Sequence, residues 1–322
     1  MKIAFIGGSG HYGLALPAIQ AREDLRVVGL AKGCAQEDVT GAARNLPGVP
    51  VDEDYRAMLD REQPDLAVVN PWYCQNAEVA AECLKRGMDV FCEKPLATTL
   101  DDLEMLEKAW RESGRALAGM FNLRGAPWFL AIRRAIEAGE IGEVRLLHGQ
   151  KSYRMGVRPE FYHTRALYGG MLPWVGIHAI DWTLQLGGAC HWLSASQSRL
   201  YNRGQGELES SAAILMRLDN EVIATVTADY FRPDGSARHD DDRLRVTGTK
   251  GMLEAIDGRV YLENEQPRRE LELPEAEDQF AAFLDAIAEN RTQGWAESAL
   301  ESSRVSLLAR QSGDEGRAIE ME

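Results

Sequence analysis

Two patterns of apolar residues alternate along the first 121 residues of the chain. Short apolar runs predict buried strands at Ile3–Ile6, Arg26–Leu30, Leu66–Asn70, Asp89–Cys92 and Ala116–Phe121. Between these runs, alanine and leucine recur at helical spacing, as in Asn76–Arg86 and Leu100–Arg111. A glycine follows the first of these helices and two threonines precede the second, as helix ends require. Such alternation is typical of an α/β fold with a doubly wound parallel sheet.

Beyond Phe121 the pattern changes. A helix at Ala126–Ala138, a strand at Val144–Tyr153 and a helix at Met171–Leu186 come first. From Trp192 to about Leu273, strand-like runs are separated by glycine and asparagine turns without intervening helices, which favours an antiparallel sheet. Two final helices are expected at Glu277–Ala288 and Ala296–Ala309. The sequence therefore predicts two domains, residues 1–121 and residues 122–322, the second of α+β type.

Composition narrows the class of protein. The formal net charge of −14 argues against nucleic-acid binding, which usually requires a basic face. The five cysteines form no CxxC pair, and no apolar run near the start has the length of a signal peptide or of a membrane span. We therefore expect a cytoplasmic protein with reduced thiols and a small-molecule partner, without a membrane or nucleic-acid role.

A glycine-rich loop follows the first strand directly. It reads Gly7, Gly8, Ser9, Gly10, His11, Tyr12 and Gly13, which fits G-x-G-x-x-G from Gly8. In this context, between a strand and a helix, glycines let the backbone approach a pyrophosphate, and the helix N-terminus offers free N–H groups. The loop predicts a dinucleotide-binding site.

The end of the second strand bears on the choice of dinucleotide. A site for NAD usually places Asp or Glu there to accept hydrogen bonds from the ribose 2′-hydroxyl. Here the strand runs into Lys32, with no carboxylate beside it. Lys32 either pairs with the 2′-phosphate of NADP or is a solvated surface lysine. The cofactor is expected to be NADP or NAD, with NADP slightly favoured.

Several segments together carry a resemblance to a known family. They are MDVFCEKPL at 88–96, DLAVVNP at 65–71, GEIGEV at 139–144, GGMLPWVGIHAID at 169–181 and VTGTKGMLE at 246–254. In this order the chain resembles the Gfo/Idh/MocA family of glucose–fructose oxidoreductase, inositol dehydrogenase and their relatives. The resemblance implies a Rossmann domain, then an α/β domain with an open, mostly antiparallel sheet. It also implies hydride transfer between NAD(P) and a hydroxyl or carbonyl carbon of a sugar, cyclitol or related polyol.

The resemblance also implies roles for particular residues. It assigns Glu93 to the cofactor, and Lys94 to the cofactor, the reacting oxygen and catalysis. His178 matches the histidine that exchanges a proton with the substrate. The family's aspartate four residues earlier is replaced by Trp174. If the segment is helical, Asp181 lies on the same face and is expected to assist His178 instead.

Further matches are looser. Asn70, Pro71 and Trp72 resemble the turn that lies over the cofactor. Gln75 and Asn76 stand where relatives often carry a histidine, which puts that contact in doubt. Candidate substrate contacts are Arg124, Tyr153, Trp174 and, near the expected cleft, Arg154, Tyr162 and His163. Family members often pair through the outer face of the second sheet, so a homodimer or homotetramer is expected.

Three alternatives stay open at this point. The missing carboxylates at positions 32 and 174 also suit a non-catalytic NAD(P)-binding sensor or interaction protein of the same fold. Some distant relatives reduce an imine or an enone, and the sequence does not distinguish these reactions. A metal site at His239–Asp242 is disfavoured, because Arg238 and Arg243 flank it and the segment reads as a solvated charged loop. No metal is expected.

Overall fold

The computed structural model describes residues 1–321 and divides the chain into two compact units. Unit 1 contains Met1–Asn122, Ala166–Gly169 and Asp278–Ser303. Unit 2 contains Leu123–Arg165, Gly170–Glu277 and the residues from Arg304 onward. The chain thus leaves unit 1 near residue 122 and returns to it in two later segments.

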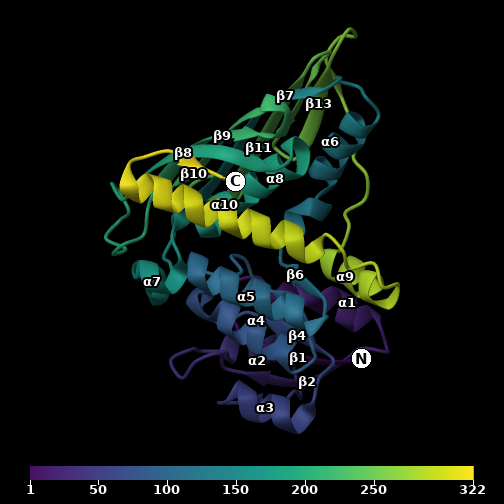
Figure 1. The fold of residues 1–322 in the computed structure, drawn as a ribbon, viewed down its shortest axis with the longest axis vertical. Helices are drawn as coiled ribbons and strands as arrows, with labels where there is room; N and C mark the ends of the chain where they lie inside the picture. The colour runs from purple at the N-terminus through teal and green to yellow at the C-terminus, as the bar shows by residue number, and fades with distance from the viewer. Residues whose placement is uncertain (322) are drawn as a thin grey trace. The chain divides into compact units, whose positions relative to one another are not determined.

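Unit 1 is built on a parallel sheet, coloured purple to blue in Figure 1. Within residues 1–321 its six strands have the order β3-β2-β1-β4-β5-β6, and every neighbouring pair is parallel. The strands are β1 (Lys2–Ile6), β2 (Arg26–Ala31), β3 (Val51–Asp52), β4 (Leu66–Val69), β5 (Asp89–Cys92) and β6 (Leu117–Gly119). This is the order of the doubly wound nucleotide-binding fold, so the predicted fold class is confirmed for this part of the chain.

The helices of unit 1 follow local signals in the sequence. They are α1 (Leu16–Ala21), α2 (Thr40–Asn45), α3 (Tyr55–Glu62), α4 (Asn76–Lys85) and α5 (Leu100–Ser113). The Thr99 side chain accepts the Asp102 N–H at the start of α5, and Gly114 ends the helix in the left-handed region. The sequence analysis placed α4 and α5 within two residues of their ends but missed α2, α3 and β3, which are short.

Helix α9 (Gln279–Ala288) joins unit 1 although it lies far along the chain. Its Phe280 and Phe283 are buried, and their ring centroids lie 5.0 Å and 5.9 Å from that of Phe91 on β5. The apolar face of α9 completes the core that the strand β5 begins. The sequence grouped this helix with residues 122–322, because periodicity alone does not reveal which sheet a helix covers.

Unit 2 contains a mixed sheet whose described strands have the order β14-β13-β12-β11-β7-β10-β9-β8-β15. Their bounds are β7 (Val144–Arg154), β8 (Cys190–Ser198), β9 (Ser211–Leu218), β10 (Ile223–Arg232), β11 (Asp240–Gly248), β12 (Met252–Ile256), β13 (Arg259–Glu263), β14 (Arg269–Glu270) and β15 (Ile319–Glu320). The pair β7–β10 is parallel and the other described pairs are antiparallel. The expected open, mostly antiparallel sheet is therefore confirmed.

Three further helices belong wholly or partly to unit 2. They are α6 (Pro127–Glu137), α8 (Ile177–Gly187) and the long helix α10 (Trp295–Glu315). Helix α10 begins in unit 1 and belongs to unit 2 from Arg304 onward. Helix α8 packs on β7, where a Cβ added to Gly149 would lie 3.2 Å from Ala179. Odd-numbered residues of β7 around Gly149 therefore face α8, and even-numbered residues face the other side of the sheet.

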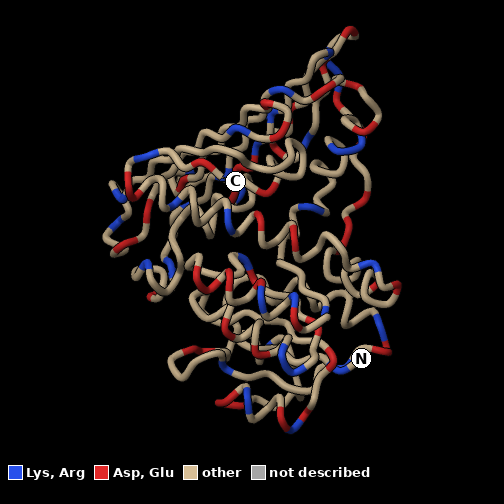
Figure 2. Tube along the Cα trace, viewed as in Figure 1, with Lys and Arg blue, Asp and Glu red and all other residues tan. Residues whose placement is uncertain are grey.

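Charged side chains are dispersed over both units. Figure 2 shows Lys and Arg interspersed with Asp and Glu along the trace of each. Among residues 1–321, none of the helices combines the length and apolar character that a membrane crossing needs.

The contribution of α9 can be measured. Replacing Phe283 with Ala removes a buried ring and is expected to destabilise the protein by about 3–5 kcal/mol. As a matched control, Val51→Ala on the exposed edge strand is expected to change stability by less than about 0.5 kcal/mol. Urea unfolding followed by tryptophan fluorescence reports both. Equal unfolding midpoints for the two variants would contradict the packing of α9 in this core.

Candidate functional site

The carboxyl ends of β1 and β4 bring the glycine loop against Asn70. The Ser9 N–H donates to the Asn70 carbonyl oxygen at 2.8 Å. Gly7 has a φ of +88°, and a Cβ there would lie 2.2 Å from the same oxygen. Gly7 is thus required both by its backbone conformation and by the close approach of the neighbouring strand end.

Gly10 is required for a similar reason. Its φ is +64°, and a Cβ there would lie 2.0 Å from Oε2 of Glu93. A Cβ on Gly13, by contrast, would meet no described heavy atom within 4 Å outside its chain neighbours. The loop continues into a 3₁₀ turn, Tyr12–Ala15, before the six-residue helix α1. Gly7 and Gly10 thus allow Asn70 and Glu93 to approach the loop closely, and Ser9 between them donates its hydroxyl to Glu37.

Glu93 joins the end of β5 to this loop. Its side chain is fully buried and accepts hydrogen bonds from the backbone N–H and Nδ1 of His11. It also accepts from Asn70 Nδ2 at 3.3 Å and from the Lys94 N–H at 2.9 Å. Burial would raise the pKa of Glu93, but His11 and Lys94 outweigh it and hold that pKa below the ordinary value. The carboxylate therefore stays charged and clamps the glycine loop.

Lys94 is buried directly after this carboxylate, at the same edge of the sheet. Its backbone is fixed by Asn76, whose Nδ2 donates to the carbonyl oxygens of Glu93 and Pro95 at 3.1 Å and 2.8 Å. Asn76 thus positions the Glu-Lys-Pro turn, a role that the sequence did not reveal. Pro71 packs closely against Gly33, and Trp72 follows it in a partly exposed position.

Several buried amide oxygens in unit 1 lack a donor. Among the described residues, no hydrogen-bond partner is present for the side-chain oxygens of Asn70, Gln75, Asn76 and Asn122. Buried acceptors are normally satisfied, and those that are not often face a ligand. The hydroxyls of a ribose and the carboxamide N–H groups of a nicotinamide are donors of the kind these oxygens lack. The residues of unit 1 therefore fit a nicotinamide dinucleotide.

The end of β2 differs from the expectation. Lys32 Nζ forms an ion pair with Glu53 at 2.6 Å. The interpretation that no carboxylate lies near this strand end is wrong, because Glu37 is buried there. Its oxygens accept the N–H groups of Gly8 and Gly33. The sequence analysis missed Glu37 because this residue lies beyond the strand, in a turn that brings its side chain to the glycine loop.

Tyr12 points to a neighbouring helix. Its hydroxyl accepts a hydrogen bond from Nδ2 of Asn45 on α2 at 2.8 Å. The ring also packs on the apolar core of unit 1. Tyr12 thus anchors the end of the glycine loop to α2.

In unit 2, the predicted helix at Met171–Leu186 is present, with a π-helical turn at Leu172–Gly176 before α8. Trp174, His178 and Asp181 are all buried. Trp174 lies edge-on to Tyr162, with ring centroids 5.9 Å apart. π-Turns of this kind are common at functional sites, since they re-aim side chains within a helix.

Asp181 is held by Arg124. Arg124 Nε donates to Oδ2 of Asp181 at 2.9 Å, and Nη2 of the same arginine donates to Oδ1. The pair is two-pronged and buried, which gives it directional strength. Two residues that the sequence assigned separately, one to substrate and one to His178, are therefore each other's partners.

The face of the sheet that carries Tyr153 holds a second buried pair, which the sequence analysis missed. Lys151 Nζ lies 2.6 Å from Oδ2 of Asp242. Burial lowers the pKa of Lys151 and raises that of Asp242. The Tyr153 ring stacks on His239 at 4.8 Å. The interpretation of residues 239–242 as a solvated loop is thus wrong, because β11 begins at Asp240 and buries Asp242.

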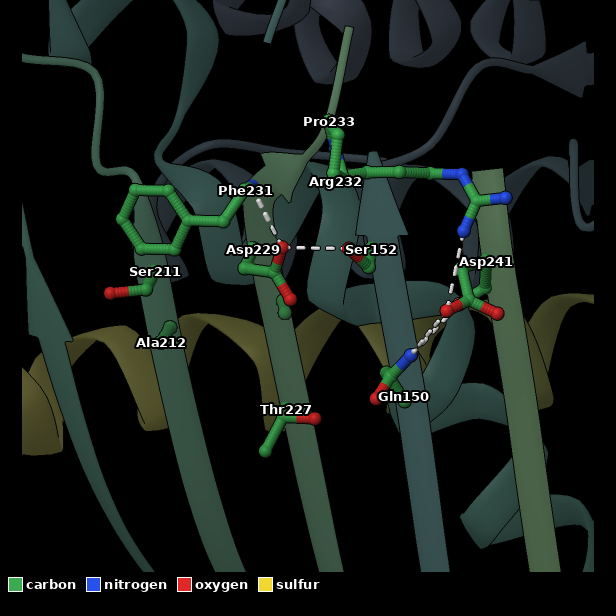
Figure 3. Close-up of a pocket in the computed structure, with 11 residues that line it drawn as sticks. Gln150, Ser152, Ser211, Ala212, Thr227, Asp229, Phe231, Arg232, Pro233 and Asp241 are labelled. Atoms are coloured by element: carbon green, nitrogen blue, oxygen red, sulfur yellow. Dashed lines mark hydrogen bonds and ion pairs between the residues drawn. The ribbon is translucent and has the colours of Figure 1, made fainter. Parts of the chain in front are cut away.

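The opposite face of this sheet carries a polar pocket of about 490 Å³. In Figure 3, Ser152 points toward Asp229, and Arg232 and Gln150 reach toward Asp241. Ser152 Oγ donates to Asp229 Oδ1 at 2.7 Å, and Arg232 pairs with Asp241 at 3.3 Å. The lining contains none of the predicted site residues and lies on the face that the resemblance assigned to subunit pairing.

Comparisons with known proteins bear on the whole chain. Residues 1–120 match the model of the oxidoreductase family with an NAD-binding Rossmann fold, and residues 129–254 match that of the GFO/IDH/MocA C-terminal domain. A Thermotoga maritima structure described as an oxidoreductase is 37% identical, with a TM-score of 0.95 over 100% of both chains. The uncharacterized oxidoreductase YrbE of Bacillus subtilis is 27% identical over 84% of this chain and 82% of its own. An inositol 2-dehydrogenase of Salmonella paratyphi B is 26% identical over 79% and 73%.

The Arg124–Asp181 pair gives a testable result. Either Arg124→Met or Asp181→Asn breaks a buried ion pair by removing one of its two charges, so each is expected to cost about 3–5 kcal/mol of unfolding free energy. The exposed pair Arg133–Glu137 provides the control, where Arg133→Met is expected to cost below about 1 kcal/mol. Urea unfolding of the two single variants and the double variant completes the cycle. Purely additive losses would show that the two side chains are not coupled.

Proposed function

The chain belongs to the GFO/IDH/MocA family of NAD-binding oxidoreductases, and we propose that it transfers a hydride between a nicotinamide dinucleotide and a hydroxyl-bearing carbon of a cyclitol, sugar or related polyol. The chemistry of the cofactor is the uptake or release of hydride at its nicotinamide ring. The inositol 2-dehydrogenase among the relatives supports a cyclitol or sugar as the substrate class. The protein's residues bind, orient and exchange protons.

One observation carries this proposal: the carboxylate that holds the glycine loop immediately precedes a buried lysine. Glu93 bonds to His11 and to the Lys94 N–H, so Lys94 is tied to the loop that fits a pyrophosphate. In doubly wound sheets, ligands bind beyond the carboxyl ends of the strands. We assign the cofactor to the glycine loop, Asn70, Pro71, Trp72 and Glu93, with the unpaired oxygens of Asn70, Gln75 and Asn76 as acceptors for its ribose and carboxamide donors.

Lys94 is assigned to the reacting oxygen. An ammonium group placed beside a substrate hydroxyl donates a hydrogen bond and stabilises the negative charge that develops as the proton leaves. Its burial strengthens this effect, because the surroundings screen charge less than water does. Lys94 therefore lowers the barrier without exchanging a proton itself.

His178 is assigned to proton transfer. In the oxidative direction its imidazole takes the hydroxyl proton, and in the reductive direction it returns it. The indole of Trp174 cannot accept a hydrogen bond as the family's aspartate would. Because Arg124 holds both oxygens of Asp181, that carboxylate orients the arginine, and we assign Arg124, Tyr153 and Trp174 to contacts with the substrate's remaining hydroxyls.

Two further proposals concern the protein's setting. The polar outer face of the unit 2 sheet is proposed to pair subunits into a homodimer or homotetramer. The five cysteines are free thiols, which suits a reducing compartment and supports the cytoplasm as the protein's location.

Replacing Lys94 tests the first role. Lys94→Met is expected to lower kcat about 100- to 1,000-fold, because one donor to the developing charge is lost. Cofactor affinity, measured by calorimetry, is expected to stay within a few-fold, since the glycine loop is untouched. Lys108→Met on the exposed face of α5 is the control. Turnover is followed by the absorbance of the reduced nicotinamide with inositols and aldoses. Undiminished turnover of Lys94→Met would remove this residue from the reaction.

Replacing His178 tests the second role. His178→Gln is expected to lower kcat by about 100- to 10,000-fold, the usual contribution of a positioned base. The acidic limb of the kcat–pH profile of alcohol oxidation is also expected to flatten, because protonation of the imidazole no longer blocks the reaction. A profile that kept its acidic limb in the variant would assign that ionisation to another group. Cofactor binding without any turnover of the parent protein would instead favour a sensor.

A further inference from the structure

Glu37 is a buried carboxylate inside the predicted cofactor site. Only 2% of the residue is exposed, and it belongs to the segment between β2 and α2. Its Oε1 accepts hydrogen bonds from the Gly8 N–H at 3.1 Å and the Ser9 hydroxyl at 3.2 Å. Its Oε2 accepts the Gly33 N–H at 2.9 Å. The carboxylate therefore bridges the glycine loop and the end of the second strand.

This location is where a dinucleotide fold recognises the adenosine ribose. An acid at the end of the second strand accepts hydrogen bonds from the ribose hydroxyls in sites that take NAD. Here the strand end carries Lys32, and the chain turns back so that the acid is supplied five positions later. A carboxylate offers about four acceptor positions, and the three donors on Glu37 leave room for a hydroxyl. Holding the glycine loop alone would require only a neutral acceptor.

The charges around Lys32 work against a phosphate. Its ammonium is already paired with Glu53 at 2.6 Å. Burial raises the pKa of Glu37, and the nearby Lys32 opposes this shift. Hydrogen bonds from Thr40 lower the pKa of Asp38, and Lys32 and Arg44 lower it further. Lys32 and Arg44 thus face three carboxylates, those of Glu37, Asp38 and Glu53, and the local charge is negative. A 2′-phosphate, itself doubly charged, would be repelled at this position.

We propose that Glu37 binds the hydroxyls of the adenosine ribose and makes the protein use NAD and reject NADP. The proposal rests on the function proposed above and adds its cofactor specificity. It reverses the expectation from the sequence, in which Lys32 favoured NADP. Lys32 instead neutralises part of an acidic cluster.

Calorimetric titration of the parent protein with NADH and with NADPH is the first experiment. NADH is expected to bind at least about tenfold more tightly than NADPH. The ribose hydroxyl of NADH would donate a hydrogen bond to the charged Glu37, whereas the 2′-phosphate of NADPH would be repelled by it. Equal affinities, or tighter binding of NADPH, would overturn the proposal while leaving the oxidoreductase function intact. Binding of neither nucleotide would overturn the proposed function itself.

Variants separate ribose recognition from a structural brace. Glu37→Gln keeps the shape and removes the charge, so NADH affinity is expected to fall about tenfold while NADPH affinity stays or rises. An equal loss for both nucleotides would mean that Glu37 only braces the loop, and would overturn the proposal. Glu78→Gln, an exposed glutamate on α4, is the matched control and is expected to leave both affinities unchanged.

Lys32→Met examines the rival interpretation in a variant that leaves Glu37 in place. The ratio of NADH to NADPH affinity is expected to stay the same or to move further toward NADH by less than about threefold, because the Glu53 partner of Lys32 is exposed to solvent. A selective loss of NADPH affinity of about tenfold or more would identify Lys32 as a phosphate contact and contradict the proposal. Thermal unfolding of each variant verifies folding, and the parent titration decides the question even if Glu37→Gln fails to fold.

Discussion

The fixed point of unit 1 is the buried carboxylate of Glu93. It lies at the end of β5 yet accepts hydrogen bonds from His11 in the glycine loop and from Asn70 at the end of β4. A buried carboxylate is stable only when its lone pairs are satisfied, so these partners cannot move apart without a large cost in free energy. Three strand ends are thereby held together, and the neighbouring Lys94 has a defined backbone position. The Glu-Lys-Pro motif is thus a structural clamp in addition to carrying the lysine that we propose acts on the substrate.

A second carboxylate gives the same loop its chemical character. Glu37 and Glu93 each accept a backbone N–H of the glycine loop, one from Gly8 and one from His11. The loop therefore contacts two carboxylates, and Lys32 and Lys94 are nearby cations. The negative charge of Glu37 would oppose an additional phosphate placed beside this loop. Cofactor specificity would then follow from where the carboxylates lie, rather than from any added contact.

Unit 2 also contains buried carboxylates, and here each one is paired with a cationic side chain. Its buried pairs, Arg124–Asp181 and Lys151–Asp242, each satisfy a charge that would be costly alone. Asp181, which the sequence analysis expected to assist His178, lies three residues after it and accepts hydrogen bonds from Arg124 on both oxygens. Trp174 stands four residues before His178, and its indole ring cannot accept a hydrogen bond as a carboxylate would.

The amino-acid sequence by itself determined the α/β class, most strand and helix positions and the family, because apolar periodicity and short glycine and Glu-Lys-Pro motifs are local signals. It could not assign α9 to unit 1, because buried phenylalanines such as Phe280 and Phe283 would suit the core of either unit. It also could not locate the two-residue strand β3. It also missed Glu37, Asn76 and Lys151, since each acts on a partner brought near by a turn, a parallel crossover or a sheet register. Only the tertiary structure decided those partners, because the burial and pairing of a charge depend on residues far away in the chain.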